Sequence, residues 1–125
     1  MTGAVLYARN IARVSGFYAG ILEMKVTHQA DDHIVLESPA FQLVVVAIPE
    51  HIAATIVLAD PPTRRIDTPI KLVFNVASIH GARTTALRLG GELNPPGREW
   101  QFQEFRVCDG HDPEGNVVQF REVAR

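Results

Sequence analysis

Apolar residues recur with helical spacing in two separate stretches of the chain. Both stretches follow the spacing i, i+3, i+7 and i+10, which predicts one amphipathic helix in each. The residues are Ile11, Val14, Tyr18 and Ile21 in the first helix, and Ile79, Ala82, Ala86 and Leu89 in the second. Asn10 and Ser78 precede the two helices as capping residues, and Gly90-Gly91 ends the second helix.

Shorter apolar stretches predict strands around these helices. The strands before the helices share an apolar face, made by Ala4, Leu6 and Ala8 in the first half and by Leu72, Phe74 and Val76 in the second. Further strands are predicted at Met24–Ala30, His33–Glu37, Phe41–Ile48, Glu92–Leu93, Phe102–Asp109 and Asn116–Val123. Each half therefore has the order βαβββ, and the chain is an internal repeat.

The repeat predicts a single domain of residues 1–125 with a first module at about 1–48 and a second at about 70–125. The connector between them, residues 49–69, contains Pro61-Pro62. Its apolar residues Ile52, Ile56 and Leu58 would be exposed on a lone domain, so the connector is expected to pack on a neighbouring surface and the protein to form a homodimer.

Composition narrows the function classes. The formal net charge is −2 with acids and bases interspersed, which indicates no nucleic-acid partner and no membrane surface as a partner. No apolar run approaches a membrane span, and a single cysteine, Cys108, excludes an internal disulfide. A cytoplasmic protein with a buried, unreactive thiol is expected.

The end of the chain carries the strongest motif. Asp112-Pro113-Glu114-Gly115 has turn chemistry at every position, and it joins two strands in Phe105–Glu122. Together with the opening Val5–Leu22, this stretch resembles the vicinal oxygen chelate superfamily, which includes glyoxalases, extradiol dioxygenases and bleomycin resistance proteins. The resemblance implies an α+β fold in which two βαβββ modules form one curved eight-stranded, mixed or antiparallel sheet. Both helices lie outside, and the opposite face is a concave cup.

That superfamily binds a divalent metal in the cup, but the corresponding positions here do not suit a metal. The resemblance places the ligand positions at Gly3, Lys71 and Gln119, with Val44 as the fourth. Only Gln119 offers a metal-binding atom, and a Lys71 ammonium would repel a cation. No cofactor is therefore predicted, and a divalent metal held by unusual ligands is the alternative.

Strand alternation assigns a mixed set of side chains to the cup. The predicted ligand-binding residues are Tyr7, Arg9, Lys71, Asn75, Trp100, Gln119 and Arg121. Basic and amide groups beside apolar ones suit a small organic molecule with an anionic or carbonyl end. An equal alternative for Lys71 is that its side chain extends into solvent. An equal alternative for Trp100 is that it forms a contact in the dimer.

Three function hypotheses remain open. The first is a metal-independent small-molecule-binding protein of the glyoxalase/bleomycin resistance/dioxygenase type. The second is a glyoxalase- or dioxygenase-like metalloenzyme, and the third is a protein-interaction module whose cup is filled by side chains. Glu99 and Glu104 are candidate bases for metal-free catalysis, and His28 and His33 are expected to form a surface pair across a turn rather than a metal site.

Overall fold

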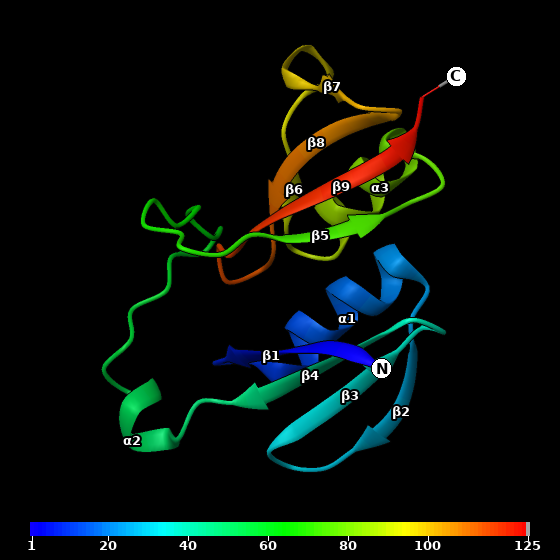
Figure 1. The fold of residues 1–125 in the computed structure, drawn as a ribbon. Helices are drawn as coiled ribbons and strands as arrows, with labels where there is room; N and C mark the ends of the chain where they lie inside the picture. The colour runs from blue at the N-terminus through cyan, green and yellow to red at the C-terminus, as the bar shows by residue number, and fades with distance from the viewer. Residues whose placement is uncertain (125) are drawn as a thin grey trace.

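The computed structural model describes residues 1–124 and contains two similar halves joined by a long connector (Figure 1). The first half comprises β1 (Thr2–Ala8), α1 (Ile11–Leu22), β2 (Lys25–Gln29), β3 (His33–Glu37) and β4 (Phe41–Ala47). The second comprises β5 (Leu72–Asn75), α3 (Ile79–Arg88), β6 (Glu92–Leu93), a 3-10 turn (Pro96–Arg98), β7 (Trp100–Phe102), β8 (Phe105–His111) and β9 (Val117–Val123). A short helix, α2 (Glu50–Ala53), begins the connector.

The paired-module α+β fold is confirmed, and its strands are divided between two sheets. The first sheet has the order β1-β4-β3-β2, and the second has the order β5-β9-β8-β6 with β7 also paired to β8. In both sheets the strand before the helix pairs in parallel with the last strand of its module, and the remaining pairs are antiparallel. One continuous sheet was expected, but β1 and β5 are each the edge of their own sheet.

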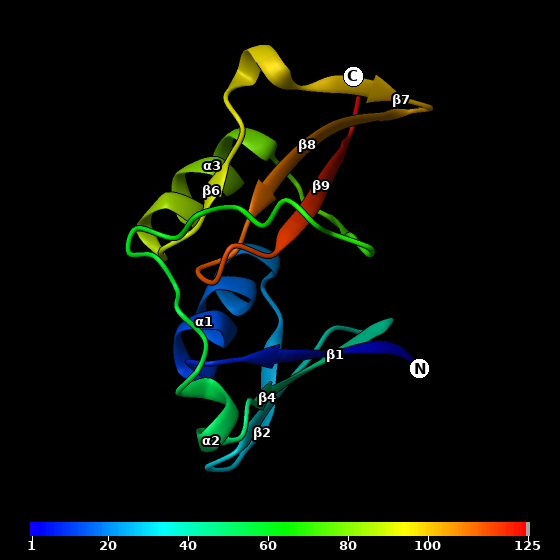
Figure 2. The same ribbon diagram turned by 90° about the vertical axis from the view of Figure 1, so that its left-hand side faces the viewer.

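Aromatic side chains occupy the boundary between the two sheets. The ring of Phe74 in β5 lies 5.9 Å from that of Tyr18 in α1 and 5.5 Å from that of Phe41 in β4. In the described residues, β1 and β5 belong to different sheets and do not pair with each other. The sheets therefore meet through side chains rather than through backbone hydrogen bonds. Figure 2 shows α1 and α3 on one side of the molecule, with β1, β8 and β9 on the other.

Both predicted helix caps are present. The Asn10 side chain accepts a hydrogen bond from the Arg13 amide, and the Ser78 hydroxyl accepts one from the Gly81 amide, each at 3.0 Å. The second helix ends as expected, since Gly90 has a φ of 95°, which a residue with a side chain rarely adopts. The two helices contact each other, and their apolar faces cover the sheets.

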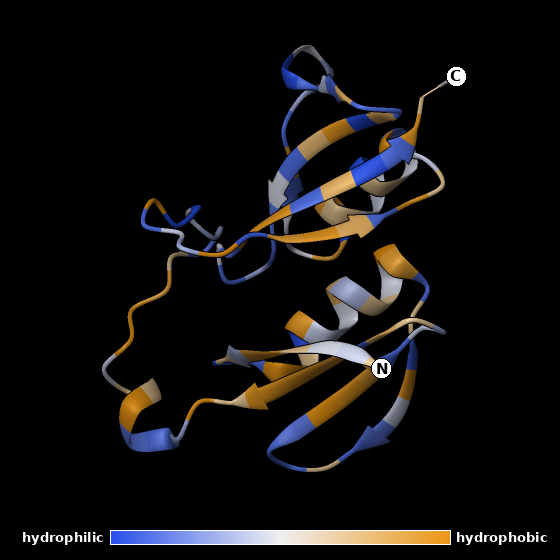
Figure 3. Ribbon diagram, in the orientation of Figure 1, coloured by the Kyte–Doolittle hydropathy of each residue, from blue (hydrophilic) through white to orange (hydrophobic). Residues whose placement is uncertain are grey.

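The core lies between the helices and the sheets. Its largest fully buried side chains come from both modules and include Phe17, Tyr18, Leu36, Leu43, Ile79 and Phe120. Val118 and Phe120 point into this core, while Gln119 between them points to the opposite face. Figure 3 shows this alternation as hydrophobic and hydrophilic bands along β9.

The terminal turn ties the second module to the first. Asp112 is fully buried, and its carboxylate accepts hydrogen bonds from the Tyr18 hydroxyl and from the amides of Glu114 and Asn116. The Glu114 carboxylate accepts the backbone N–H groups of Arg9 and Asn10, both at 2.8 Å. The motif that identified the hairpin in the sequence is therefore also the main polar contact between the modules.

Two segments differ from the prediction. The strand predicted at Phe102–Asp109 begins only at Phe105, as β8, because the chain reverses at Gln103, which has a φ of 53°; Phe102 belongs to β7, which was not predicted. Helix α2 was not predicted, since its four residues are too few for a helical pattern in the sequence. The longest helix, α1, has 12 residues, whereas a bilayer span needs about 20, so none of the helices in residues 1–124 can cross a membrane.

Candidate functional site

The second sheet presents a mixed polar and aromatic surface on the face turned away from the helices. Strand register places Val73, Gln119 and Asp109 in one row across β5, β9 and β8. The next row contains Asn75, Arg121, Val107 and Trp100. Residues in direct register point to the same face of a sheet, so four of the predicted ligand-binding residues share this face: Asn75, Trp100, Gln119 and Arg121.

Four side chains on this surface form a continuous chain of hydrogen bonds, which we call the polar chain. Lys71 Nζ donates to Asp109 Oδ2 at 2.8 Å, and Gln119 Nε2 donates to Asp109 Oδ1 at 3.2 Å. Arg121 Nε donates to Gln119 Oε1 at 2.8 Å. Both ends of the chain are cationic and its single anion lies between them, so the group carries one net positive charge.

Burial varies along the polar chain. The Gln119 residue is 6% exposed, whereas the side chains of Asp109 and Lys71 are 20% and 37% exposed. Lys71 therefore reaches the surface without extending freely into solvent, because Asp109 holds its ammonium. The ammonium has two further N–H donors that a ligand could use.

An aromatic row continues the surface beyond Arg121. The Arg121 guanidinium carbon lies 5.0 Å from the ring centre of Phe102 and 5.8 Å from that of Phe105, within the range of cation–π attraction. Among residues 1–124, no hydrogen bond partner meets Arg121 Nη1 or Nη2. Trp100 and Phe102 are 39% and 44% exposed. A planar apolar group could lie on these rings while an anionic group meets the guanidinium.

The remaining predicted residues lie elsewhere. Tyr7 is on β1 of the first sheet, in register with Val46, and is 61% exposed. Arg9 follows β1 at the end of that sheet, and its Nη1 donates to the carbonyl of Ile56 in the connector at 3.0 Å. The structure thus brings Lys71, Gln119 and Arg121 together and places Arg9 against the connector.

Three residues of the surface were missed by the sequence reading: Asp109, Phe102 and Phe105. The signal for Asp109 was present, because a hairpin centred on the Asp112–Gly115 turn pairs it with Gln119. The two phenylalanines could not be assigned. The chain turns back at Gln103 so that β8 pairs with β7, and no glycine or proline in the sequence marks this turn.

The metal-ligand positions implied by the resemblance do not fit a metal. At Gly3, an added Cβ would lie 2.5 Å from the carbonyl oxygen of Gln42, so a coordinating side chain cannot be placed there without displacing β4. Val44 is apolar, Lys71 is a cation, and both polar atoms of the Gln119 amide already have partners. Within residues 1–124, no three His, Cys, Asp or Glu side chains form a group that could hold a metal ion.

Of the two candidate bases, Glu104 is exposed and Glu99 is held in ion pairs. Glu99 has a side chain only 8% exposed, and it is held between Arg83, with which it forms a short contact, and Arg106, whose Nε lies 2.6 Å from Oε1. Burial alone would raise the pKa of this carboxyl, but the hydrogen bonds from Arg83 and Arg106 outweigh it and lower the pKa below its usual value. A carboxylate held this way is a structural group rather than a free base.

His28 and His33 form the expected pair at the surface, and Cys108 is buried. The rings of His28 and His33 face each other at 5.1 Å, and His33 Nδ1 lies 2.8 Å from the exposed Asp32 carboxylate, which lowers the Asp32 pKa through that hydrogen bond. Cys108 is fully buried, and burial raises the pKa of its thiol. A buried thiol with a raised pKa is a poor nucleophile.

Comparison with known proteins identifies the relatives of this arrangement. Residues 3–120 match the family model described as a glyoxalase-like domain. A glyoxalase/bleomycin resistance protein/dioxygenase family enzyme from Burkholderia phytofirmans PsJN superposes with a TM-score of 0.72 at 16% identity, covering 98% of this chain and 97% of that one. No curated protein sequence matches the chain.

Two resistance proteins have the same fold. A fosfomycin resistance protein from Mesorhizobium loti superposes with a TM-score of 0.66 at 8% identity, covering 98% of this chain and 89% of its own. A bleomycin resistance determinant encoded on the transposon Tn5 gives a TM-score of 0.63 at 13% identity, covering 98% and 97%. At these identities the likeness establishes the fold alone.

Proposed function

The chain belongs to the glyoxalase-like family, and on that premise we propose that it is a metal-independent binding protein for a small, flat organic anion. The observation that carries the proposal is the polar chain of Lys71, Asp109, Gln119 and Arg121, which includes two of the positions, Lys71 and Gln119, that the resemblance assigns to metal ligands. The ligand's carboxylate, phenolate or enolate would be bound by fixed cations of the protein instead of a metal ion.

Electrostatics support an anionic ligand. The polar chain keeps one net positive charge, and its cations retain N–H donors, two on Lys71 and those of the Arg121 terminal nitrogens. A charge-assisted hydrogen bond to such a group is typically worth about 1.5 to 3 kcal/mol. Asp109 limits the anionic charge that the surface can accept, so a singly charged ligand is favoured over a doubly charged one.

The aromatic row supports a flat body. Phe102 and Trp100 are partly exposed beside Arg121, and they offer ring faces and edges to a planar ligand. The names of two structural neighbours, resistance proteins for fosfomycin and bleomycin, agree with a small molecule as the ligand class. We extend the proposal to a homodimer in the cytoplasm.

The test is a thermal-shift and calorimetric screen of aromatic carboxylates against three proteins: wild type, Lys71→Met and Lys25→Met. Methionine retains the apolar stem of lysine and removes the charge. The chain has no lysines other than Lys25 and Lys71, so Lys25→Met is a matched control on the exposed strand β2. The expected result is a ligand that binds Lys71→Met about tenfold or more weakly and Lys25→Met unchanged. Equal affinity for wild type and Lys71→Met would refute the proposal.

A further inference from the structure

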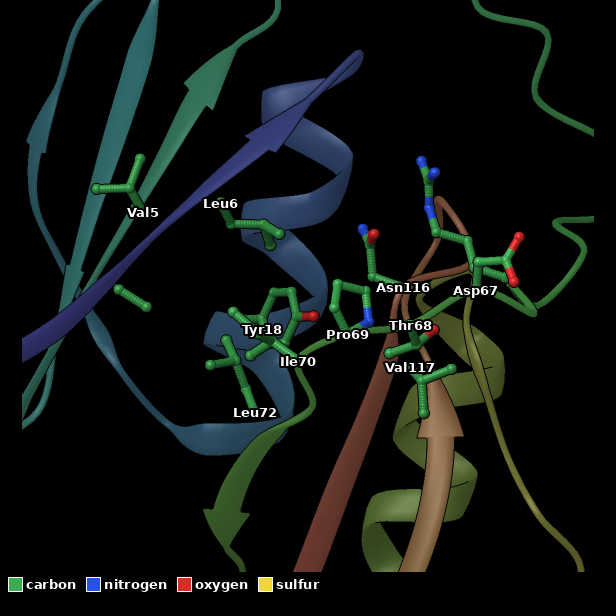
Figure 4. Close-up of a pocket in the computed structure, with 12 residues that line it drawn as sticks. Val5, Leu6, Tyr18, Asp67, Thr68, Pro69, Ile70, Leu72, Asn116 and Val117 are labelled. Atoms are coloured by element: carbon green, nitrogen blue, oxygen red, sulfur yellow. The ribbon is translucent and has the colours of Figure 1, made fainter.

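A cavity of about 340 Å³ lies at the boundary between the two modules, separate from the polar chain. The edge strand β1 contributes Ala4, Val5 and Leu6, the start of the second module contributes Ile70 and Leu72, and α1 contributes the ring of Tyr18. Figure 4 shows Tyr18 beside Ile70 and Leu72, with Thr68, Asn116 and Val117 on the far side. We call this space the seam cavity. Its volume lies within the range of about 300 to 1,000 Å³ that is usual for ligand sites.

The residues that lead into β5 contribute to two different sites. Ile70 and Leu72 line the cavity, whereas Lys71 between them does not and instead binds Asp109 on the other face. Ala4, Leu6 and Leu72 pack against the core beneath the helices. The seam cavity therefore contains no residue of the polar chain, although Val117 in its lining shares a face of β9 with Gln119.

The connector forms the outer wall of the seam cavity and is fixed in place. Arg65, Asp67, Thr68 and Pro69 line it, and the Arg65 amide donates a 2.9 Å hydrogen bond to the carbonyl of Gly115 in the terminal turn. Gly115 has a φ of 82°, and a Cβ at this position would collide with the carbonyl oxygen of Thr63. A close backbone contact of this kind holds the wall of the cavity against the second module.

The polar groups of the seam cavity define the chemistry of its occupant. The Thr68 hydroxyl is buried and has no hydrogen bond partner, which is costly unless something else supplies one. The Tyr18 hydroxyl and the Asn116 amide are already engaged by Asp112. Arg65 and Asp67 are exposed and carry opposite charges, so they favour neither an anion nor a cation.

We propose that the seam cavity is a second binding site, which takes a neutral and mostly apolar small molecule with one carbonyl or hydroxyl group directed to Thr68 Oγ1. The apolar walls provide most of the affinity through burial, and the single hydrogen bond orients the ligand. A charged ligand is disfavoured, because the only charged lining residues, Arg65 and Asp67, are exposed and of opposite sign.

The test uses three probes of similar shape: acetophenone, which has a carbonyl, ethylbenzene, which lacks it, and benzoate, which is an anion. Binding is measured by NMR chemical-shift titration of isotope-labelled wild type, Thr68→Val, Thr63→Val and Lys71→Met. Thr68→Val keeps the shape of the side chain and removes the hydroxyl. Thr63→Val makes the same change at an exposed position of the connector that does not line the cavity.

Acetophenone is expected to bind wild type and Thr63→Val equally and Thr68→Val about threefold to tenfold more weakly, while ethylbenzene binds all of them alike. Lys71→Met should leave acetophenone binding unchanged even if it abolishes benzoate binding, which separates this site from the proposed function. Ala4→Leu, which fills the cavity, should abolish binding of both neutral probes. No saturable binding of either neutral probe to wild type would overturn the proposal. The same holds for unchanged acetophenone affinity in Thr68→Val, or for loss of acetophenone binding in Lys71→Met.

Discussion

The hydroxyl of Tyr18 in α1 donates a 2.9 Å hydrogen bond to Oδ2 of Asp112, a fully buried residue that follows it by 94 positions in the chain. The bond joins the helix of the first module to the terminal turn of the second. Tyr18 is itself 1% exposed, so neither partner can exchange the bond for one to water. This pair is therefore a buried polar contact between the two modules, beside the bonds that Glu114 accepts from Arg9 and Asn10.

Tyr18→Phe should lower the free energy of unfolding by about 1.5 to 3 kcal/mol, because it removes a hydrogen bond to a buried carboxylate without leaving a large cavity. Urea denaturation followed by circular dichroism measures the change. Tyr7→Phe is the matched control, since the chain contains no tyrosines beyond these two and Tyr7 is 61% exposed. A change under about 0.5 kcal/mol is expected there. Equal effects of the two substitutions would contradict the assigned role.

The same pair predicts a response to alkaline pH. Burial raises the pKa of the Tyr18 hydroxyl well above its ordinary value, and the Asp112 charge and hydrogen bond raise it further. The folded state thus keeps a proton that the unfolded state releases near pH 10, so the stability from Tyr18 is complete below about pH 10 and is lost as the pH rises above it. Wild type should lose stability between about pH 9.5 and 11 more steeply than Tyr18→Phe in denaturation series. Parallel curves would argue against the linkage.

Glu99 should contribute in the opposite pH range. Its pKa is lowered in the folded state against the effect of burial, by the hydrogen bonds from Arg83 and Arg106, so its contribution is present above the unfolded pKa near 4.3 and is lost as the pH falls. Glu99→Gln should destabilise the protein by about 1.5 to 3 kcal/mol at pH 7, and the difference from wild type should shrink below about pH 4. Glu104→Gln, at an exposed position, is the control with little expected effect. A pH-independent difference for Glu99→Gln would refute this.

Gly3 should resist substitution. An added Cβ would meet the carbonyl oxygen of Gln42 at 2.5 Å, so Gly3→Ala is expected to cost about 1 to 3 kcal/mol through displacement of the backbone. Gly16→Ala is the contrasting control, because Gly16 lies in α1 with open space around its Cβ position and alanine favours helix by about 1 kcal/mol. Thermal denaturation should therefore move in opposite directions for the two variants. A stable Gly3→Ala protein would remove the steric argument against a metal ligand at this position.

The homodimer stays a prediction. Substitution of exposed apolar residues in the connector tests it. Val57 and Ile66 are 94% and 95% exposed, so a partner chain that covered them would bury apolar surface. Light scattering at micromolar concentration should give about twice the chain mass of 13.8 kDa. The double variant Val57→Ser and Ile66→Ser should shift the mass toward the monomer, while Val26→Ser on β2 should not. A monomeric wild type would contradict the prediction.

Much of the fold could be predicted because the chain repeats its own pattern. The spacing of Ile11, Val14 and Tyr18 returns in the second helix, and Asn10 and Ser78 cap the two helices by the same hydrogen bond. The division into two sheets was not predictable in this way. At the boundary Phe74 contacts Tyr18 and Phe41, and such contacts among residues of three elements leave no periodic signal.

The candidate site was predicted only in part, for a related reason. Alternation within β9 placed Gln119 and Arg121 on one face, and the position of Lys71 followed from the resemblance. The pairing of Lys71 with Asp109 is a tertiary contact between β8 and the chain just before β5, and the placement of Phe102 depends on a reversal at Gln103 with no turn residue to mark it. Arg9 was assigned to the cup by alternation, but the strand ends at Ala8, and from there Glu114 and the connector determine its contacts.

The central claim is that fixed cations of the chain, and not a divalent metal, bind the ligand. Isothermal titration of the best aromatic carboxylate into wild type tests it most directly, with one titration in excess EDTA and others with added Zn²⁺, Ni²⁺ or Mn²⁺. The predicted result is the same dissociation constant, within error, under all four conditions, together with a loss of about tenfold or more in Lys71→Met. Binding that disappears in EDTA and returns with one of the metals would contradict the account.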